Sequence, residues 1–319
     1  MKTKVLFHDN CFDGAASAAV FSRFYRERIN ASAELVYEGL SHQAGGAPIP
    51  DSVFTGDENA IVDFRYSQNP RLTWWFDHHQ SAFQQAGDEA HFRADASGKK
   101  FHDGKRKSCT LYLADVAKAT FGFDPAPLAE LLHWAELIDS AKFESPTQAV
   151  ELKEPALRLM TVLEANKDPD FIPGIIRDFQ VKTLAEVARQ EKVNAAFEPL
   201  WTRHQRAIEI IRAKAKIEDN VVFFDVADEK LDSINKFIAY YLFPDAAYTV
   251  WVGAGPQRAK VSIGSNPWHP ELRRHDLSQM AEKFGGGGHP VVAAMSFKAD
   301  QVPQAREAAA ELLGQLRTS

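Results

Sequence analysis

An apolar segment, residues 72–76 (Leu-Thr-Trp-Trp-Phe), constrains the fold of this chain more than any other stretch. It does not alternate between apolar and polar residues, which is typical of a strand buried on both faces of a parallel sheet. The segment stops at Asp77, His78 and His79. In open α/β sheets, ligands bind just beyond the carboxyl ends of such strands. One carboxylate and two imidazoles there indicate a site for metal or phosphate chemistry, although a polar turn explains this stretch equally well when it is taken alone.

Two other segments predicted to be strands lead to residues of the same kind. Residues 5–7 form a short apolar strand followed by His8 and, after a turn, by Asp13 at the start of a predicted helix. Residues 60–64 form another strand, and Asp63 falls at its carboxyl end. Asp13 alone could be a helix cap, since carboxylates cap helices well. A cap does not explain the histidine in the same turn, so we expect these groups to converge with the Asp-His-His turn at one edge of the sheet.

A helix predicted from Pro125 ends in a further carboxylate. Its apolar side chains recur at helical spacing, and Asp139 follows at the end of this apolar face, where a charge needs a partner. The strand ends and Asp139 together offer more ligands than one ion needs. Carboxylates and imidazoles suit Mn²⁺ and, less well, Zn²⁺ or Mg²⁺, and their number indicates two ions about 3.5–4 Å apart. A structural metal site would more often use cysteines, so the pattern favours catalysis.

The composition limits which classes of protein the chain can belong to. Its 319 residues allow two domains, and its net charge of −6 provides no general positive field for long nucleic acids. The only cysteines, Cys11 and Cys109, exclude a disulfide framework and are typical of a reducing compartment. No segment resembles the apolar core of a signal peptide or a membrane span. We therefore expect a cytoplasmic protein that holds any anionic substrate locally.

The second half of the chain predicts a smaller domain. Residues 183–217 form a long, charged, amphipathic segment that contains Pro199, which we interpret as a kinked helix. From residue 220 on, strands and helices follow in mixed order, as in α+β domains. Four consecutive glycines, residues 285–288, precede His289. A packed domain keeps such a run at an entropic cost, so we expect its backbone to approach a phosphate closely rather than to act as a flexible linker.

These motifs resemble those of the DHH phosphoesterase superfamily, which includes RecJ-like exonucleases and nano-RNases. The resemblance rests on the Asp77-His78-His79 turn, the upstream His/Asp turn and the downstream Gly-Gly-Gly-Gly-His, and covers residues 4–140 and 220–298. It implies an α/β fold in which a parallel-sheet DHH domain with helices on both faces is joined by a long helix to a smaller α+β domain that binds substrate. The corresponding boundaries are 1–182 for the DHH domain, 183–219 for the linker helix and 220–319 for the DHH-associated domain.

The resemblance also implies roles for individual residues. Asp77 would orient its neighbours, and His79 would contact the scissile phosphate or protonate the leaving group. In the second domain, His289 would grip a phosphate beside the backbone of Gly286, Gly287 and Gly288. The metal ligands that it implies, for two Mn²⁺ ions, are His8, Asp13, Asp63, His78 and Asp139.

Two positions depart from the superfamily's pattern. The common first motif has an aspartate two residues before Asp13, where this chain has Cys11. Either Cys11 becomes a soft ligand, or Asp9 takes its place, or water completes the coordination. Many relatives also carry an arginine in the strand before the glycine run, and residues 262–266 contain none. The arginines that could substitute in contacting the substrate are Arg258, Arg273 and Arg274.

We predict a metal-dependent phosphoesterase that acts on short single-stranded oligonucleotides or small nucleotides. A pyrophosphatase or exopolyphosphatase would share the metal site, but relatives of that kind use a different C-terminal domain. A non-catalytic nucleotide-binding protein would explain Cys11 as the mark of a decayed site. Clustered carboxylates repel one another, however, and would not be expected without a metal. Nothing in the sequence points to an obligate protein partner or to a membrane.

Overall fold

The computed structural model describes residues 1–42, 46–229, 231 and 234–317. The chain folds into two compact units. The first consists of Met1–Phe143 and Lys153–Glu198, and the second of Glu144–Leu152 and Pro199–Ser319. The chain therefore contributes a short segment to the second unit, returns to the first, and leaves it again within a long helix.

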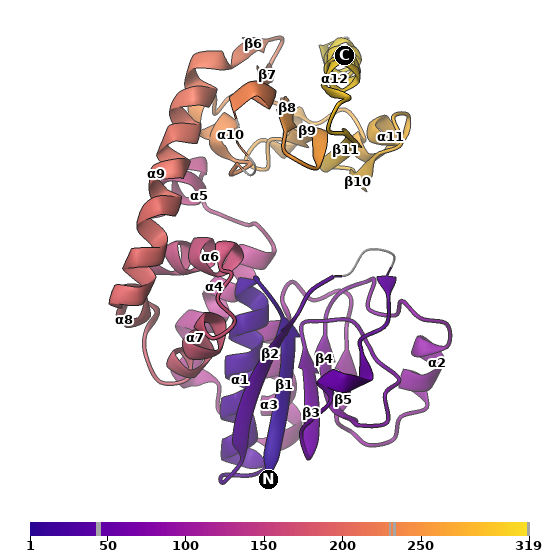
Figure 1. Cartoon of the computed structure of the whole chain (residues 1–319), viewed down its shortest axis with the longest axis vertical. Helices are drawn as coiled ribbons and strands as arrows, with labels where there is room; N and C mark the ends of the chain where they lie inside the picture. The colour runs from indigo at the N-terminus through magenta and orange to yellow at the C-terminus, as the bar shows by residue number, and fades with distance from the viewer. Residues whose placement is uncertain (43–45, 230, 232–233, 318–319) are drawn as a thin grey trace. The chain divides into compact units, whose positions relative to one another are not determined.

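The first unit is built on a parallel sheet (Figure 1). Its strand order is β2-β1-β3-β4-β5, and every neighbouring pair is parallel. The apolar segment described above forms β4, in the interior of the sheet, as expected for a strand buried on both faces. The α/β fold class is confirmed. The strands are β1 (Lys2–His8), β2 (Glu34–Leu40), β3 (Glu58–Val62), β4 (Leu72–Asp77) and β5 (Lys100–His102).

Successive side chains of β4 point to opposite faces of the sheet, and each face is covered. On one face, the ring of Phe21 from α1 (Phe12–Arg28) lies 6.1 Å from the rings of both Trp74 and Phe76. On the other face, the ring of Trp75 lies 5.2 Å from Phe92 of α2 (Asp88–Arg93). The remaining helices of this unit are α3 (Cys109–Phe121), α4 (Ala129–Asp139), α6 (Pro155–Ala165), α7 (Phe171–Phe179) and α8 (Leu184–Ala188), with 3-10 turns at Asp51–Val53 and Ala126–Leu128.

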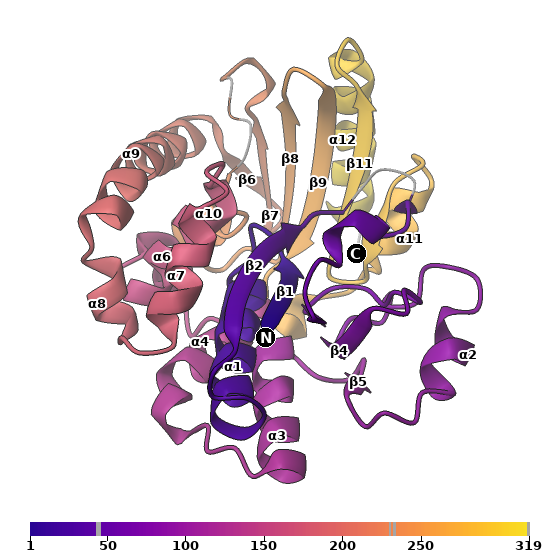
Figure 2. The same cartoon turned by 60° about the horizontal axis from the view of Figure 1, so that its bottom comes forward.

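The second unit contains a six-stranded mixed sheet in the order β10-β11-β9-β8-β7-β6. Among the described strands of this sheet, β7 and β8 pair in parallel and all other neighbours are antiparallel. Helix α12 (Val302–Arg317) lies along this sheet, and its apolar residues share one core with the strands (Figure 2). The strands are β6 (Lys216–Glu218), β7 (Val221–Asp225), β8 (Tyr248–Ala254), β9 (Arg258–Ser265), β10 (Gly287–His289) and β11 (Val292–Lys298). The other helices are α5 (Pro146–Glu151), α10 (Ile238–Leu242) and α11 (Leu277–Glu282), with 3-10 turns at Ala227–Glu229 and Pro270–Leu272.

Two segments differ from the sequence-based expectation. The long charged segment breaks at residues 189–190, so the single expected helix is divided into α8 and α9 (Glu191–Lys214), and α9 contains Pro199. The glycine run is not only a loop, because residues 287–289 form β10 and pair with β11. Among the described residues, no helix combines the length and apolarity needed to cross a membrane.

Candidate metal centre

The carboxyl ends of three adjacent strands gather acidic and imidazole side chains in the first unit. His8 ends β1, Asp63 follows β3, and the Asp77-His78-His79 turn begins at the last residue of β4. In the described part of the chain, three groups of candidate ligand atoms lie within 4.8 Å of one another. These groups are His8 with Cys11 and Asp63, Asp63 with His78 and His79, and Asp13 with His78 and Asp139.

His78 lies at the centre of this cluster, where it is only 8% exposed. Its Nδ1 lies 3.2 Å from the carbonyl oxygen of Arg106, to which it donates in the neutral tautomer with the proton on Nδ1. That tautomer leaves the Nε2 lone pair facing the carboxylates, as in histidines that bind metals. The Nε2 atom lies 3.4 Å from Asp63 Oδ1, 3.5 Å from Asp139 Oδ2 and 3.7 Å from Asp13 Oδ2.

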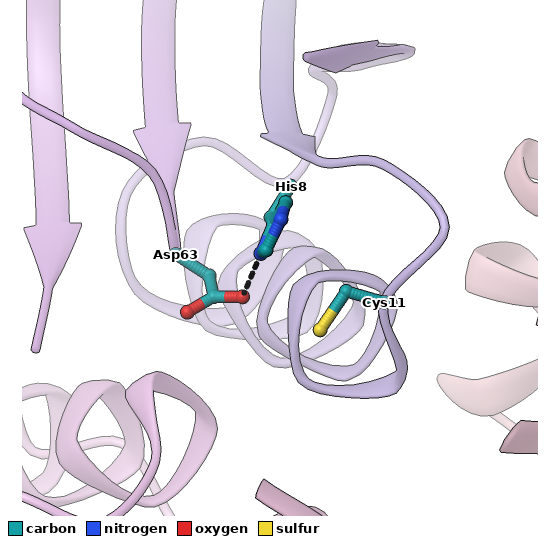
Figure 3. A group of neighbouring side chains, drawn as sticks. All are labelled: His8, Cys11 and Asp63. Carbon is teal, nitrogen blue, oxygen red and sulfur yellow. Dashed lines mark hydrogen bonds and ion pairs between the residues drawn. The ribbon is translucent and has the colours of Figure 1, made fainter. Parts of the chain in front are cut away.

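Asp63 is held in an unusual backbone conformation at the end of β3. Its φ is +56°, in the left-handed region that few residues other than glycine adopt, and its N–H donates to the carbonyl of Phe76 at 2.9 Å. The surrounding sheet thus imposes a strained conformation that directs this carboxylate into the cluster. Its Oδ2 lies 3.3 Å from Nδ1 of His8 (Figure 3).

Asp13 joins the starts of two helices. It lies in the first turn of α1, but its carboxylate accepts hydrogen bonds from the first N–H groups of α3, those of Cys109 at 2.7 Å and Thr110 at 3.1 Å. The residue is therefore a cap, as the sequence allowed, although for a different helix. Its Oδ2 also faces His78, so the cap and the cluster share this oxygen.

Asp77 supports the two histidines that follow it. The Oδ1 atom of Asp77 accepts from the backbone N–H of His78 at 2.8 Å and from Nδ1 of His79 at 2.7 Å. Asp77 is fully buried and belongs to none of the three ligand groups found among the described residues. The Nδ1–H bond fixes the ring of His79 and leaves its Nε2 for another partner.

The protonation equilibria of the cluster show its excess of carboxylates. Burial and the charge of Asp63 raise the pKa of Asp139 to about 6, and the same causes raise the pKa of Asp13. Burial disfavours protonation of His78, but Asp63 and the neighbouring carboxylates raise its pKa to about 10. Burial likewise disfavours ionisation of Asp63, but the neighbouring imidazoles of His78 and His8 bring its pKa to about 2. A cation in the cluster would remove this repulsion.

The donor atoms themselves fit a divalent cation. Among the described residues, Asp63 Oδ1 and His78 Nε2 are buried side-chain atoms without a hydrogen-bond partner. Buried polar atoms are usually paired, so two of them facing each other in one cluster point to a ligand. Carboxylate oxygens and imidazole nitrogens are donors that Mn²⁺, Mg²⁺ and Zn²⁺ accept. The residues at this edge of the sheet therefore fit a metal centre.

Cys11 and Asp9 are the two candidate ligands for the position at which the common first motif has an aspartate, and their side chains have different surroundings. Cys11 shares a ligand group with His8 and Asp63 (Figure 3). Asp9 belongs to none of the described groups, because its side chain lies against Gly39 of β2 and accepts from the N–H of Asn10 at 3.0 Å. Burial and the nearby Asp63 and Asp13 carboxylates raise the pKa of the Cys11 thiol.

The predicted substrate-binding residues lie in the second unit. A Cβ at Gly286 would come within 2.4 Å of the carbonyl oxygen of Ala294, and one at Gly288, whose φ is +152°, within 2.4 Å of that of Val292. These two glycines are thus required for close packing of β10 on β11. Gly287 and His289 of β10 are exposed, and Arg273 donates from Nε to the hydroxyl of Ser265 at 2.9 Å.

Several supporting residues were not found from the sequence. His102 Nε2 lies 2.8 Å from the carbonyl of His79, to which it donates, and Asn10 Nδ2 donates to two carbonyls at the end of α6, at 3.0 and 2.8 Å. The ring of His42 lies 5.2 Å from that of His8, two residues beyond β2. The same rule about strand ends applies to His42 and to His102, which ends β5, whereas no local pattern marks Asn10.

The fold of this chain is similar to that of several solved structures. A pGpG-specific phosphodiesterase, PggH from Vibrio cholerae, is similar with a TM-score of 0.71 and 18% identity over 99% of both chains. A DHH-domain protein described as a member of a family of ribosomal proteins has a TM-score of 0.61 and 13% identity, over 98% of this chain and 86% of its own.

RecJ from Thermus thermophilus in complex with Mn²⁺ is similar with a TM-score of 0.53 and 12% identity. The match covers 98% of this chain but 52% of RecJ, so the chain corresponds to about half of that exonuclease. No family model and no curated protein matches the sequence. The resemblance to the DHH superfamily is thus confirmed at the level of the fold.

Proposed function

We propose that the chain is a metal-dependent phosphoesterase that hydrolyses phosphoester bonds of short oligonucleotides or small nucleotides. The observation that carries this proposal is the pair of buried, unpartnered atoms, Asp63 Oδ1 and His78 Nε2, at the edge where three parallel strands end. Buried polar atoms without a partner are costly to a fold unless a ligand binds them.

Five residues of the cluster would hold the metal ions. Divalent ions bound there would neutralise phosphate oxygens and lower the pKa of a bound water. We propose Mn²⁺, with Mg²⁺ or Zn²⁺ as alternatives, and two ions because the ligand groups overlap at Asp63 and His78. The ligands would be His8, Asp13, Asp63, His78 and Asp139.

Asp77 and His79 would act on the substrate side of the centre. Its bond to Asp77 raises the pKa of His79, against the effect of burial, and so favours a protonated ring. With Nδ1 engaged, His79 would present Nε2–H to a phosphate oxygen or to the leaving group. Asp77 would be a positioning residue that sets the orientation of both histidines.

The second unit would hold the rest of the substrate. The backbone of β10 is exposed and two of its three residues are glycines, so a phosphate would approach it closely, and His289 and Arg273 add positive or hydrogen-bonding groups. This role is proposed for Gly286, Gly287, Gly288, His289 and Arg273.

The names and lengths of the similar proteins favour a small substrate. The full-length match is to a phosphodiesterase described as specific for pGpG, a linear dinucleotide, whereas the RecJ exonuclease is about twice as long as this chain. A net charge of −6 also gives little general attraction for long strands. We therefore propose dinucleotides and very short oligonucleotides as the first substrates to test, in a protein that works in the cytoplasm.

The test is a hydrolysis assay with Mn²⁺ on pGpG, a five-nucleotide strand, a long single strand, adenosine 3′,5′-bisphosphate, a cyclic dinucleotide and pyrophosphate. We expect turnover of the short nucleotides. We expect loss of turnover in His78→Ala, but not in His133→Ala, which removes an exposed histidine of α4. Turnover of pyrophosphate alone, or binding of nucleotides without hydrolysis, would contradict the proposal.

A further inference from the structure

Cys11 occupies the position immediately before helix α1, yet it does not act as its cap. The residue is the N-cap by its extended backbone, with φ −132° and ψ 136°, but its side chain makes no capping hydrogen bond. Serine, threonine, aspartate or asparagine would usually stand there to bind the first N–H groups. The thiol is a free cysteine at an intermediate level of exposure. Its side chain is therefore not needed for the local structure of the helix.

The thiol points into the metal cluster. The Sγ atom of Cys11, a ring nitrogen of His8 and a carboxylate oxygen of Asp63 all lie within 4.8 Å of one another. Figure 3 shows the three side chains converging from the end of β1, the end of β3 and the start of α1. Metal–sulfur bonds of about 2.3 Å and metal–nitrogen bonds of about 2.0–2.1 Å place the ligands of one ion at most about 4.4 Å apart. Small side-chain movements would thus bring all three atoms onto one ion.

A packing role does not account for this placement. A structural cysteine usually sits among apolar side chains. Cys11 instead faces Asp63, which is 1% exposed and has Oδ1 without a hydrogen-bond partner within the described residues. The competing carboxylate, Asp9, lies against Gly39 and bonds the next backbone N–H.

We propose that Sγ of Cys11 is a thiolate ligand of the metal centre, on the ion that His8 and Asp63 also bind. This inference rests on the metal centre of the proposed function. As the ion binds, the thiol releases its proton to solvent, so a dication and one anionic sulfur leave one net positive charge before the carboxylates are counted. A sulfur donor favours softer ions, so this site binds Co²⁺ and Zn²⁺ more strongly relative to Mn²⁺ than a site with a carboxylate in that place.

Cobalt spectroscopy tests this ligand without reference to activity. Co²⁺ added to the metal-free full chain gives visible ligand-field bands wherever it binds, and a near-ultraviolet charge-transfer band only where a thiolate binds it. The variants are Cys11→Ser, Cys11→Asp and the matched control Cys109→Ser. Cys109 is a buried cysteine whose thiol donates to the carbonyl of Phe76 at 3.3 Å and which belongs to none of the described ligand groups.

We expect the charge-transfer band in the wild type and in Cys109→Ser, and its loss in both Cys11 variants. We also expect Cys11→Asp to lower the Co²⁺ affinity relative to the Mn²⁺ affinity by at least about tenfold, a loss that even groups supporting metal ligands can cause. Should Cys11→Ser not fold, the wild type, Cys11→Asp and Cys109→Ser still decide the question.

Ligand-field bands without a charge-transfer band in the wild type would overturn the inference and leave the proposed metal centre standing. A charge-transfer band that disappears in Cys109→Ser would also overturn it. Absence of all cobalt bands in the wild type would overturn both the inference and the metal centre.

Discussion

The carboxylate of Asp77 lies 2.7 Å from Nδ1 of His79 and also accepts the backbone N–H groups of His78 and His79. One buried oxygen thereby fixes both the path of the turn and the ring of its second histidine. A residue in this position contributes to the site through the histidines that it orients.

Asp77→Asn should lower turnover strongly while the chain stays folded. An amide keeps the shape of the side chain but offers a neutral oxygen. The bond to His79 therefore weakens, and the pKa of His79 falls. We expect a decrease in kcat of at least about tenfold, with a smaller change in KM. Steady-state kinetics checks this.

Asp88→Asn is the matched control for this variant. Asp88 is also buried and accepts from two backbone N–H groups, those of Gln84 at 3.1 Å and Gln85 at 2.8 Å, but it contacts none of the clustered histidines in the described structure. It should lose stability and keep kcat. Equal kcat losses in the two variants would mean that Asp77 acts only on the fold.

Gly14 should tolerate no side chain. A Cβ there would lie 2.1 Å from the carbonyl oxygen of His8, so α1 could not approach β1 as it does. We expect Gly14→Ala to lower the free energy of unfolding by at least about 1–3 kcal/mol, as overpacking does. A Cβ at Gly314 of α12 would meet no atom within 4 Å apart from its chain neighbours and the backbone of its own helix, and Gly314→Ala should raise stability by about 0.5–1 kcal/mol. Thermal denaturation of both variants would show opposite shifts, and a stable Gly14→Ala would refute the close approach.

The sequence predicted the strand ends because the sheet is parallel and in register. Phe7 pairs with Val62, and Val62 pairs with Phe76, so the residues that follow them are neighbours across the sheet. His8, Asp63 and Asp77 occupy those following positions. The rule that ligands bind at the carboxyl ends of parallel strands therefore predicted most residues of the cluster.

What the sequence did not predict depends on the paths of loops. The carbonyl of Arg106 that fixes His78, and the imidazole of His102 that holds His79, come from a segment whose course no periodic pattern determines. The break at residues 189–190 is a different case. One helix was expected over residues 183–217, but a turn at this point separates α8 from α9. Propensity is a weak guide where tertiary packing supports the backbone.

Stability should decrease in mild acid partly because of His204. This residue of α9 lies 2.8 Å from the carbonyl of Val150 through Nε2, and burial lowers its pKa below the usual 6.5. The unfolded chain then binds more protons than the folded chain below pH 6.5, so the neutral ring's contribution is present above that pH and is lost as the pH falls.

The variant His204→Gln keeps an N–H donor for Val150 but does not titrate. We expect the difference in Tm between the wild type and this variant to become less favourable to the wild type between pH 7.5 and pH 5.5. A difference independent of pH would show that His204 titrates alike in the folded and unfolded chains.

Divalent metal should stabilise the folded chain. Because only the folded cluster assembles the ligands, Mn²⁺ at about 100 times its Kd should add about 2.7 kcal/mol to the free energy of unfolding. Calorimetric scans of the chain with Mn²⁺ and with a chelator measure this difference in the free energy of unfolding. Asp63→Asn, in which asparagine tolerates the same left-handed backbone, should fold but lose the effect. A Mn²⁺ shift of the same size in that variant would place the metal elsewhere.

Anomalous diffraction from crystals soaked in Mn²⁺ tests the central claim most directly. We predict two anomalous peaks at the carboxyl ends of β1, β3 and β4, one close to Nε2 of His78 and both within coordinating distance of Asp63. Peaks elsewhere on the molecule, or none at this edge of the sheet under saturating Mn²⁺, would contradict the account of this chain as a metal-dependent phosphoesterase.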